Sequence, residues 1–241
     1  MKCAIVVPVI NEKDNLEKLI PAIFYIMTDC MILIVDDNSQ DGTKGLLDKF
    51  IKENKKIHHI IRRNDLGYGK SISAGLNWCF NNGFDNVVTM DADFSHDPSL
   101  LPKMIEKLDE NDLVIGSRYI RGGGTLNWGI HRKILSRFAN WYVRFILQVP
   151  FHDGTAGFVA YNRKALTAVQ LRGSSGQGYA FLVETKYNIA NAGLKIGEIP
   201  IIFKDRTNGN SKMSWKIIWE SIWLPWRLRF SKNKDNDIIK I

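Results

Sequence analysis

The stretch "CAIVVPVINEKDNLEKLIPAIFYIM", residues 3–27, decides the fold because its hydrophobic period changes from that of a buried strand to that of a helix. Its opening run, CAIVVPV, is apolar throughout and rich in β-branched residues, which is typical of a strand covered on both faces. The apolar residues that follow recur at helical spacing on one face: Leu16, Leu19, Ile20, Ile23 and Met27. The stretch therefore predicts a β-strand followed by an α-helix.

The same alternation continues through the first half of the chain. A second apolar run, "MILIVDD" at 31–37, precedes "SQDGTKGLLDKFI", in which Ser or Asp can cap a helix. Three further strands are predicted at "KIHHIIRR", "NVVTMD" and "DLVIGSR", with helices at about 70–82 and 98–109. Apolar strands that alternate with helices predict an α/β fold with a mostly parallel sheet covered on both faces.

The second half has a different character. The segment "RYIRGGGTLNWG", which begins at Arg118, is Gly-rich and is expected to be mobile. An amphipathic helix is predicted at 130–147, with polar positions that include Arg132, Lys133, Arg137 and Arg144. Shorter elements are predicted at 157–161, 180–192 and 195–203.

A second amphipathic helix is predicted near the end of the sequence, at 212–230. Its tryptophans share one face, and the segment also carries several cations: Trp215, Trp219, Trp223 and Trp226, with Lys212, Lys216, Arg227, Arg229 and Lys232. A tryptophan stripe can belong to a core, but a basic helix of this kind also fits a membrane interface. The predicted division is a domain at 1–211, an interfacial helix at 212–232 and a flexible tail at 233–241.

Composition limits the partners and the compartment. The formal net charge of +8 predicts an anionic partner, which could be nucleic acid, an acidic membrane surface or a phosphorylated substrate. The 3 cysteines include no C-x-x-C pair, which argues against a disulfide framework or structural zinc and favours a reducing cytosol. No window reaches the roughly 18 uncharged apolar residues of a membrane span, and the first residues become polar too early for a signal peptide. We expect a chain that is soluble or lies on a membrane.

Polar residues follow the predicted strands at their carboxyl ends, where ligands bind in parallel sheets. They are Asn11 and Glu12, Asp36 and Asp37, Asp91 and Asp93, and Arg118. A carboxylate directly after a buried strand can accept hydrogen bonds from a base edge or from ribose hydroxyls. An Asx-turn or a helix N-cap is the simpler alternative for the pair at 36 and 37.

The segment "TMDADFSHD", residues 89–97, combines two kinds of acidic residue. Asp91 and Asp93 are two apart, so in extended backbone both would point to one side and could hold Mg²⁺ or Mn²⁺ together with phosphates. Ser95 is a possible third ligand, directly or through water. Asp97 precedes Pro98 and is predicted to cap the next helix. His96 is expected at the surface or beside the ligands, because a lone histidine is weak support for zinc.

Two basic loops remain. "GYGKS" at 67–71 is not a P-loop, because that motif needs glycine where this chain has Asn64, and a tight loop beside a nucleotide is the better interpretation. In "DRTNGNSKMS", Arg206 and Lys212 flank Gly209, which suits a loop over a diphosphate as well as a solvated turn.

Taken together, these segments resemble the family 2 glycosyltransferases of the GT-A fold, and more narrowly the polyprenyl-phosphate (dolichyl-phosphate) mannose synthases. The segments that carry the resemblance are "VVPVINEKDNL", "IVDDNSQDGT", "MDADFSHDP", "IGSRYIRGGG", "DGTAGFVAYNRKAL", "GYAFLVET" and "EIPIIFKDRTNGNSKMS". They cover residues from about 4 to 214 in the family's order and spacing. The resemblance is to the short, peripheral kind without transmembrane helices.

The resemblance implies a Rossmann-like nucleotide-sugar-binding domain, with GDP-mannose as donor, a polyprenyl phosphate as acceptor and Mg²⁺ or Mn²⁺ as cofactor. The nucleoside would be held by Pro8, Ile10, Glu12, Val35 and Asp37. The diphosphate and metal would meet a DXD-type element made of Asp91, Ala92 and Asp93, with Ser95 beside it. Phosphates of donor or acceptor would contact Arg118, Arg206 and Lys212. Where relatives often have an aromatic, this chain has Ile10; some have Gln at the place of Ser95.

The resemblance also implies a peripheral protein on the cytosolic face of a membrane, with small membrane-anchoring subunits as possible partners. Three alternatives remain at this stage. The donor could be UDP-glucose or a UDP-N-acetylhexosamine; the acceptor could be a sugar hydroxyl, for which Asp153 or Glu184 would have to act as base; or the chain could be a catalytically idle nucleotide-sugar-binding subunit. A nucleic-acid partner is not expected, because the cations lie in glycosyltransferase-like loops and Trp-rich helices.

Overall fold

The computed structural model describes residues 1–172, 178–205 and 215–230, and it is built on one central sheet. The sheet has 7 strands in the order β3-β2-β1-β4-β7-β5-β8, all parallel except β7, which is antiparallel to both of its neighbours. The strands are β1 (Cys3–Val9), β2 (Met31–Asp36), β3 (Ile57–Ile61), β4 (Asn86–Thr89), β5 (Leu113–Ser117), β7 (Val159–Tyr161) and β8 (Ile196–Pro200). The predicted α/β fold with a mostly parallel sheet is confirmed.

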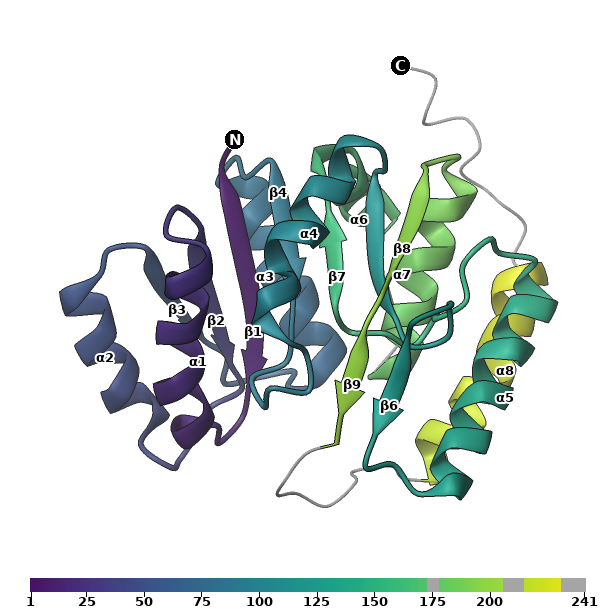
Figure 1. Ribbon diagram of the computed structural model, residues 1–241, viewed down its shortest axis with the longest axis horizontal. Helices are drawn as coiled ribbons and strands as arrows, with labels where there is room; N and C mark the ends of the chain where they lie inside the picture. Colours follow the sequence, from purple (N-terminus) through teal and green to yellow (C-terminus); the bar gives the residue numbers. More distant parts are fainter. Residues whose placement is uncertain (173–177, 206–214, 231–241) are drawn as a thin grey trace.

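Helices cover both faces of the sheet (Figure 1). One apolar core lies under α1 (Lys13–Ile26), α2 (Thr43–Glu53) and α4 (Leu101–Glu106). The other lies under α3 (Tyr68–Asn81), α5 (Ile130–Leu147), α6 (Arg163–Arg172), α7 (Tyr179–Asn191) and α8 (Trp215–Phe230). Within the described residues no helix is both long enough and apolar enough to cross a bilayer, and the three cysteines are free thiols.

The Gly-rich segment after Arg118 differs from its prediction, because part of it forms a strand. Strand β6 (Gly124–Leu126) pairs in parallel with β9 (Ile202–Lys204) in a separate two-stranded ribbon. A Cβ at Gly123 would lie 2.5 Å from the backbone oxygen of Ser117, so glycine lets the chain fold back against the end of β5. The glycines thus allow a close approach of two backbone segments.

Two other differences have local causes. The helix predicted at 98–109 is divided into a 3₁₀ turn at Pro98–Leu100, α4, and a second 3₁₀ turn at Lys107–Asp109. Pro102 has no N–H, so the bond expected there in a continuous helix cannot form. The predicted element at 195–203 is likewise two strands, β8 and β9, and helix α6 was not predicted.

The strand order places the predicted ligand edge. Strands β2 and β3 are added on one side of β1 and β4 on the other, so the strand order reverses between β1 and β4. Such a switch point opens a crevice at the carboxyl ends of the strands. These ends lie along the lower side of the sheet in Figure 1, where β6 and β9 also lie. Residues that follow β1, β2, β4 and β5 are therefore brought to one edge.

Candidate active site

The loop that follows β4 carries the predicted acidic pair. The strand ends at Thr89, and the backbone beyond it bends, with Phe94 in the left-handed region at φ 58°. The bend begins at Ala92, between the two aspartates, so the extended backbone expected from Asp91 to Asp93 is not present, and hydrogen bonds hold the loop instead. Asp91 accepts a hydrogen bond of 2.8 Å from the hydroxyl of Tyr68, and Asp93 accepts one of 3.0 Å from the backbone N–H of Ser95.

His96 fixes the base of this loop and is buried, with 2% of its surface exposed; of the two expected positions it takes the one beside the ligands and not the one at the surface. Its Nδ1 lies 3.0 Å from the backbone nitrogen of Asp91 and accepts that N–H, which leaves the ring proton on Nε2 in the neutral form. Its ring stacks on Phe158 at 5.1 Å between centroids. Burial lowers the pKa of His96, against the opposing charges of Asp91 and Asp93. The neutral ring can therefore keep its hydrogen bond.

The residues of this loop fit a hard divalent cation that also binds a diphosphate. Both aspartate side chains are partly exposed at the edge, and the hydroxyl of Ser95 is buried with no hydrogen-bond partner among the described residues. Those residues contain no group of three or more His, Cys, Asp or Glu that could hold a metal by themselves. A cation here would thus need phosphate or water oxygens to complete its shell. Asp97 accepts from the N–H of Ser99 at 2.9 Å, which confirms it as the cap of the next turn.

The two aspartates at the end of β2, Asp36 and Asp37, are both buried, and they accept hydrogen bonds from different partners. Asp36 accepts from the N–H and hydroxyl of Ser39 at 2.8 and 2.6 Å. Burial raises the pKa of Asp36, but hydrogen bonds from His59 and Ser39 outweigh it and the pKa is lowered. Asp37 accepts from the N–H of Gly67 at 2.7 Å and from two side chains. Of "GYGKS", only Gly67 lies in a loop beside the end of β2, whereas residues 68–71 form the first turn of α3, so the expected tight loop is wrong for those four residues.

The remaining partners of Asp37 are the guanidinium of Arg62 at 2.7 Å and the hydroxyl of Ser71 at 2.6 Å. With 7% of its surface exposed, Asp37 holds three chain segments together, and a nucleoside could reach only the rim of its carboxylate.

The other residues expected at the nucleoside lie around the β1 end. Ile10 is 43% exposed, and Pro8 and Glu12 are partly buried. The carboxylate of Glu12 accepts from the Asn15 side chain at 2.6 Å. Val35 is fully buried, so its side chain is part of the core beneath this edge and is not exposed to a nucleoside.

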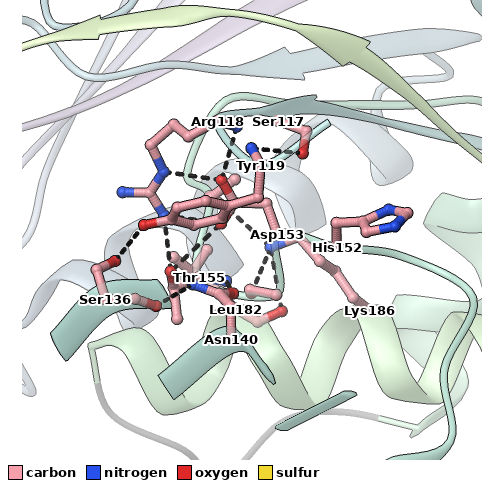
Figure 2. A network of polar contacts seen from close by, with 12 residues as sticks. Ser117, Arg118, Tyr119, Ser136, Asn140, His152, Asp153, Thr155, Leu182 and Lys186 are labelled. Carbon is pink, nitrogen blue, oxygen red and sulfur yellow. Dashed lines mark hydrogen bonds and ion pairs between the residues drawn. The ribbon is translucent and has the colours of Figure 1, made fainter. Parts of the chain in front are cut away.

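Arg118, at the end of β5, forms a buried ion pair that the sequence did not predict (Figure 2). Its Nε and Nη2 each donate to a different carboxylate oxygen of Asp153 at 2.7 Å, and its backbone N–H donates to Asp153 at 3.0 Å. Nη2 also donates to the hydroxyl of Thr155 at 2.7 Å. Burial raises the pKa of Asp153, but Arg118 outweighs it and the pKa is lowered. Nε and Nη2 of the guanidinium therefore already donate their hydrogen bonds to groups of the protein.

Lys186 of α7 supports the same loop from inside. The side chain is 1% exposed, and its ammonium donates to the carbonyls of Gly154 at 2.9 Å and Ala156 at 2.7 Å (Figure 2). Burial lowers the pKa of Lys186 to about 7, against the attraction of Asp153. The loop therefore encloses two cationic side chains around a single aspartate.

A small basic pocket lies next to Arg118. It encloses about 220 Å³ and is lined by Arg118, Tyr119, Gly124, Thr125, Lys133 and Arg137. Neither Lys133 nor Arg137 forms an ion pair with any described residue, so both cations are available to an anion. Phe203 joins this pocket to the acidic loop, because its ring lies 5.5 Å from the guanidinium carbon of Arg118 and 5.5 Å from the ring centre of His96.

Sequence reasoning missed several residues that shape the site, and two predicted residues lie outside the described part of the chain. Arg206 and Lys212 fall in 206–214, outside the described residues. Tyr68 was missed although it lies in the "GYGKS" segment that had been singled out. Gly157 was also missed: a Cβ there would lie 2.3 Å from the Tyr68 hydroxyl, so only glycine leaves room for it.

Comparisons with known proteins identify the family. Residues 4–169 match the family described as Glycosyl transferase family 2. The chain is 35% identical over 240 residues to a polyprenol monophosphomannose synthase of Mycolicibacterium smegmatis, covering 98% of this chain and 91% of the relative. It is 36% identical over 222 residues to an undecaprenyl-phosphate mannosyltransferase of Micrococcus luteus, covering 92% and 91%.

Solved structures share the fold at lower identity. Glucosyl-3-phosphoglycerate synthase from Mycobacterium tuberculosis, in complex with Mn²⁺, UDP-glucose and phosphoglyceric acid, has a TM-score of 0.68 and 18% identity over 93% of this chain and 79% of that one. The same enzyme with Mn²⁺, UDP and its product has a TM-score of 0.66 and 17% identity, covering 95% and 79%. These two show the fold alone. With the family match and the two relatives, they make the chain a GT-A-fold member of glycosyltransferase family 2.

Proposed function

We propose that this chain transfers mannose from GDP-mannose to a polyprenyl phosphate of the dolichyl type, with inversion, giving polyprenyl phosphate β-mannose and GDP. The observation that carries the proposal is the acidic loop of Asp91 and Asp93 beside a basic pocket with two available cations. The loop suits a cation-bound diphosphate, and the pocket suits a second phosphate. The two curated relatives, named for mannose transfer to lipid phosphates, support the same reaction.

The chemistry needs little from the protein beyond alignment and charge. A phosphate oxygen of the acceptor forms a bond to the anomeric carbon, the bond from that carbon to the donor diphosphate breaks, and GDP leaves with the electron pair. The acceptor is already an anion near neutral pH because its second pKa is about 6, so no general base is required. Displacement from the opposite face converts an α-linked donor sugar to a β-linked product.

The acidic loop would hold the donor end. Asp91, Asp93 and Ser95 would bind Mg²⁺ or Mn²⁺, with Ala92 between them, and the bound cation would neutralise charge on the departing diphosphate. The residues fit because the Ser95 hydroxyl has no partner among described residues and both carboxylates are hard oxygen ligands. Tyr68 and His96 orient Asp91 through its carboxylate and its N–H.

The basic pocket would hold the acceptor phosphate. Lys133 and Arg137 would contact the phosphate oxygens, and Arg118 would form the wall, held there by Asp153. Their positive charge would offset the repulsion between the acceptor and donor phosphates. This refines the role expected for Arg118, whose Nε and Nη2 are already bonded to carboxylate.

Other parts of the proposal follow the resemblance. Arg206 and Lys212 would contact phosphates of donor or acceptor, and the nucleoside would lie against Ile10, Glu12 and the rim of Asp37. The chain would work as a peripheral protein on the cytosolic face of a membrane, where its lipid acceptor is dissolved, and small anchoring subunits would be compatible partners.

Two alternatives fit less well. A sugar-hydroxyl acceptor needs a base, but Asp153 is fully buried against Arg118 and Glu184 is only 8% exposed. A UDP-sugar donor remains the strongest competitor, because the fold neighbours hold UDP or UDP-glucose. An idle subunit would have no need of the acidic pair.

A donor panel tests the proposal. Purified chain is incubated with Mn²⁺ or Mg²⁺, a short polyprenyl phosphate, and GDP-mannose, UDP-glucose or UDP-N-acetylglucosamine in turn, and lipid-linked sugar is measured. We expect transfer from GDP-mannose, and loss of transfer in Asp93→Ala but not in the surface control Asp48→Ala. If only a UDP-sugar supports transfer, the proposed donor is wrong and the UDP-sugar takes its place. If no donor supports transfer and Asp93→Ala binds GDP as well as wild type does, the proposal is refuted.

A further inference from the structure

Helices α5 and α8 pack side by side at one end of the molecule (Figure 1), and both carry large apolar side chains that are exposed. The exposed side chains include Phe138, Trp141 and Phe145 of α5 and Trp223, Trp226 and Phe230 of α8, which are between 39% and 72% exposed. Single exposed apolar residues need no explanation, but a contiguous aromatic face indicates a surface that meets a partner.

The face is built around a defined groove. The hydroxyl of Tyr142 donates to the carbonyl of Ile222 at 2.9 Å and accepts from the indole N–H of Trp226 at 2.7 Å, which fixes the two helices to each other. Trp141 stacks on Phe145 at 5.5 Å, and Trp226 on Phe230 at 5.8 Å. Between these aromatic pairs lies a groove of about 680 Å³.

Two arginines line the groove, and they point to the charge of its occupant. Arg144 and Arg229 are both exposed, and neither forms an ion pair with any residue of the described chain. Helix α5 has four Lys or Arg residues and no Asp or Glu. Aromatic walls with two guanidinium groups that have no acidic partner among the described residues match a molecule that is both apolar and anionic, because arginine binds phosphate oxygens bidentately.

We propose that this groove binds the headgroup of an anionic phospholipid while the surrounding aromatic side chains enter the acyl region of the bilayer. The inference rests on the proposed function only in placing the chain at a membrane. A hydrocarbon tail alone would leave the two arginines without a role. The acceptor has one phosphate, which is assigned to the pocket at Lys133 and Arg137. Arg137 and Arg144 are seven positions apart in α5, which places the groove about 10 Å along the helix from that pocket. A bilayer phospholipid is therefore the occupant.

The experiment is vesicle co-sedimentation of the full chain without donor or metal. Vesicles of phosphatidylcholine alone are compared with vesicles that also contain phosphatidylglycerol. The test variant is Arg144→Gln with Arg229→Gln, and the charge-matched control is Lys18→Gln with Lys49→Gln, two exposed residues of α1 and α2. All four side chains are exposed, so both variants are expected to melt with the wild-type chain.

We expect the groove variant to bind phosphatidylglycerol vesicles about thirtyfold more weakly, from ~1 kcal/mol per basic residue at an anionic surface, while the control changes less than about threefold. Equal losses in the two variants would overturn the site, because they would show a diffuse field. So would equal binding of the wild-type chain to the two kinds of vesicle, because the groove would then have no preference for an anionic headgroup.

A second measurement separates this inference from the proposed function. In detergent with a short-chain acceptor, the groove variant is expected to keep its transfer rate. A loss of transfer there would assign the groove to the reaction and overturn the phospholipid assignment. Failure to find any transferase activity leaves the vesicle result unchanged, because that assay uses neither donor nor acceptor.

Discussion

Replacing Asp153 by asparagine should destabilise the protein strongly, because it leaves two buried cations without their shared counter-charge. Asp153 is fully buried and accepts three hydrogen bonds from Arg118, at 2.7, 2.7 and 3.0 Å. Lys186 lies in the same loop network and is attracted by the same carboxylate. Asparagine keeps the shape but removes the charge, and its amide group would place donors against the donors of Arg118.

The expected loss is about 3–5 kcal/mol, the range for breaking a buried ion pair from one side. A domain has a total stability of about 5–15 kcal/mol, so the variant would lose roughly a fifth or more of it. For a chain of this size the melting temperature should fall by roughly 10 °C, at ~2–4 °C per kcal/mol. Urea unfolding followed by tryptophan fluorescence, with calorimetry as the second measurement, gives both quantities.

The loss of stability should also depend on pH, and the titration of Lys186 determines whether the loss grows or shrinks as the pH rises. Burial lowers the pKa of Lys186 to about 7, whereas the unfolded value is that of an ordinary lysine. Above pH 7 the native lysine is increasingly neutral while the unfolded one still binds its proton, so stability rises with pH through that window. Without Asp153 the native pKa of Lys186 falls further. The difference between wild type and Asp153→Asn should therefore be larger at pH 6 than at pH 9.

The control is Asp48→Asn, which breaks the exposed pair of Asp48 with Lys44 on α2 and should cause no resolvable change. If Asp153→Asn unfolds at the same urea concentration as the control, the buried pair does not stabilise the fold as argued. A loss that is equal at pH 6 and pH 9 would remove Lys186 from the explanation and leave only Arg118.

Three further outcomes test the acidic loop. Gly157→Ala should lower transfer by about tenfold or more, because its Cβ would lie 2.3 Å from the Tyr68 hydroxyl. The control Gly45→Ala, whose Cβ would have no atom within 4 Å, should keep activity and melt slightly higher. Equal transfer rates in the two variants would count against the Tyr68 contact. Tyr68→Phe removes the 2.8 Å bond to Asp91 and should raise the Mn²⁺ concentration for half-maximal transfer by about tenfold or more, with kcat at saturating Mn²⁺ little changed. Chelation with EDTA should abolish transfer, and added Mn²⁺ or Mg²⁺ should restore it in wild type but not in Asp93→Ala; full activity in EDTA would contradict a metal site.

Local hydrophobic pattern was enough to predict most of the sheet and its helices. Strands such as β1 and β2 are apolar along nearly their whole length and rich in β-branched residues, a pattern typical of strands buried on both faces. Helix α5 begins and ends where its amphipathic pattern predicted; in the structure Gly129 precedes it, and Gln148 ends it in the left-handed region at φ 52°. These features depend on residues close together in the chain.

What could not be predicted depends on contacts between distant segments. Strand β7 has three residues, and its antiparallel place between β4 and β5 is determined by pairing, for which its short sequence has no signal. The pair of Arg118 with Asp153 joins residues 35 positions apart. Lys186 was not singled out because lysine is almost always exposed. The burial of His96 was not predicted because its aromatic neighbours, Phe158 and Phe203, come from distant parts of the chain.

The loop at 153–157 connects the two halves of the candidate site. At one end Asp153 fixes Arg118 at the wall of the basic pocket. At the other end the carbonyl of Gly157 accepts from the Thr89 hydroxyl at 2.7 Å, where β4 ends, and its Cα lies against Tyr68. Because Lys186 ties the middle of this loop to α7, the loop has little freedom to adjust one end alone. A reaction that must hold two phosphates at a fixed separation needs such a support, since aligning the reactants is the main part of its catalysis.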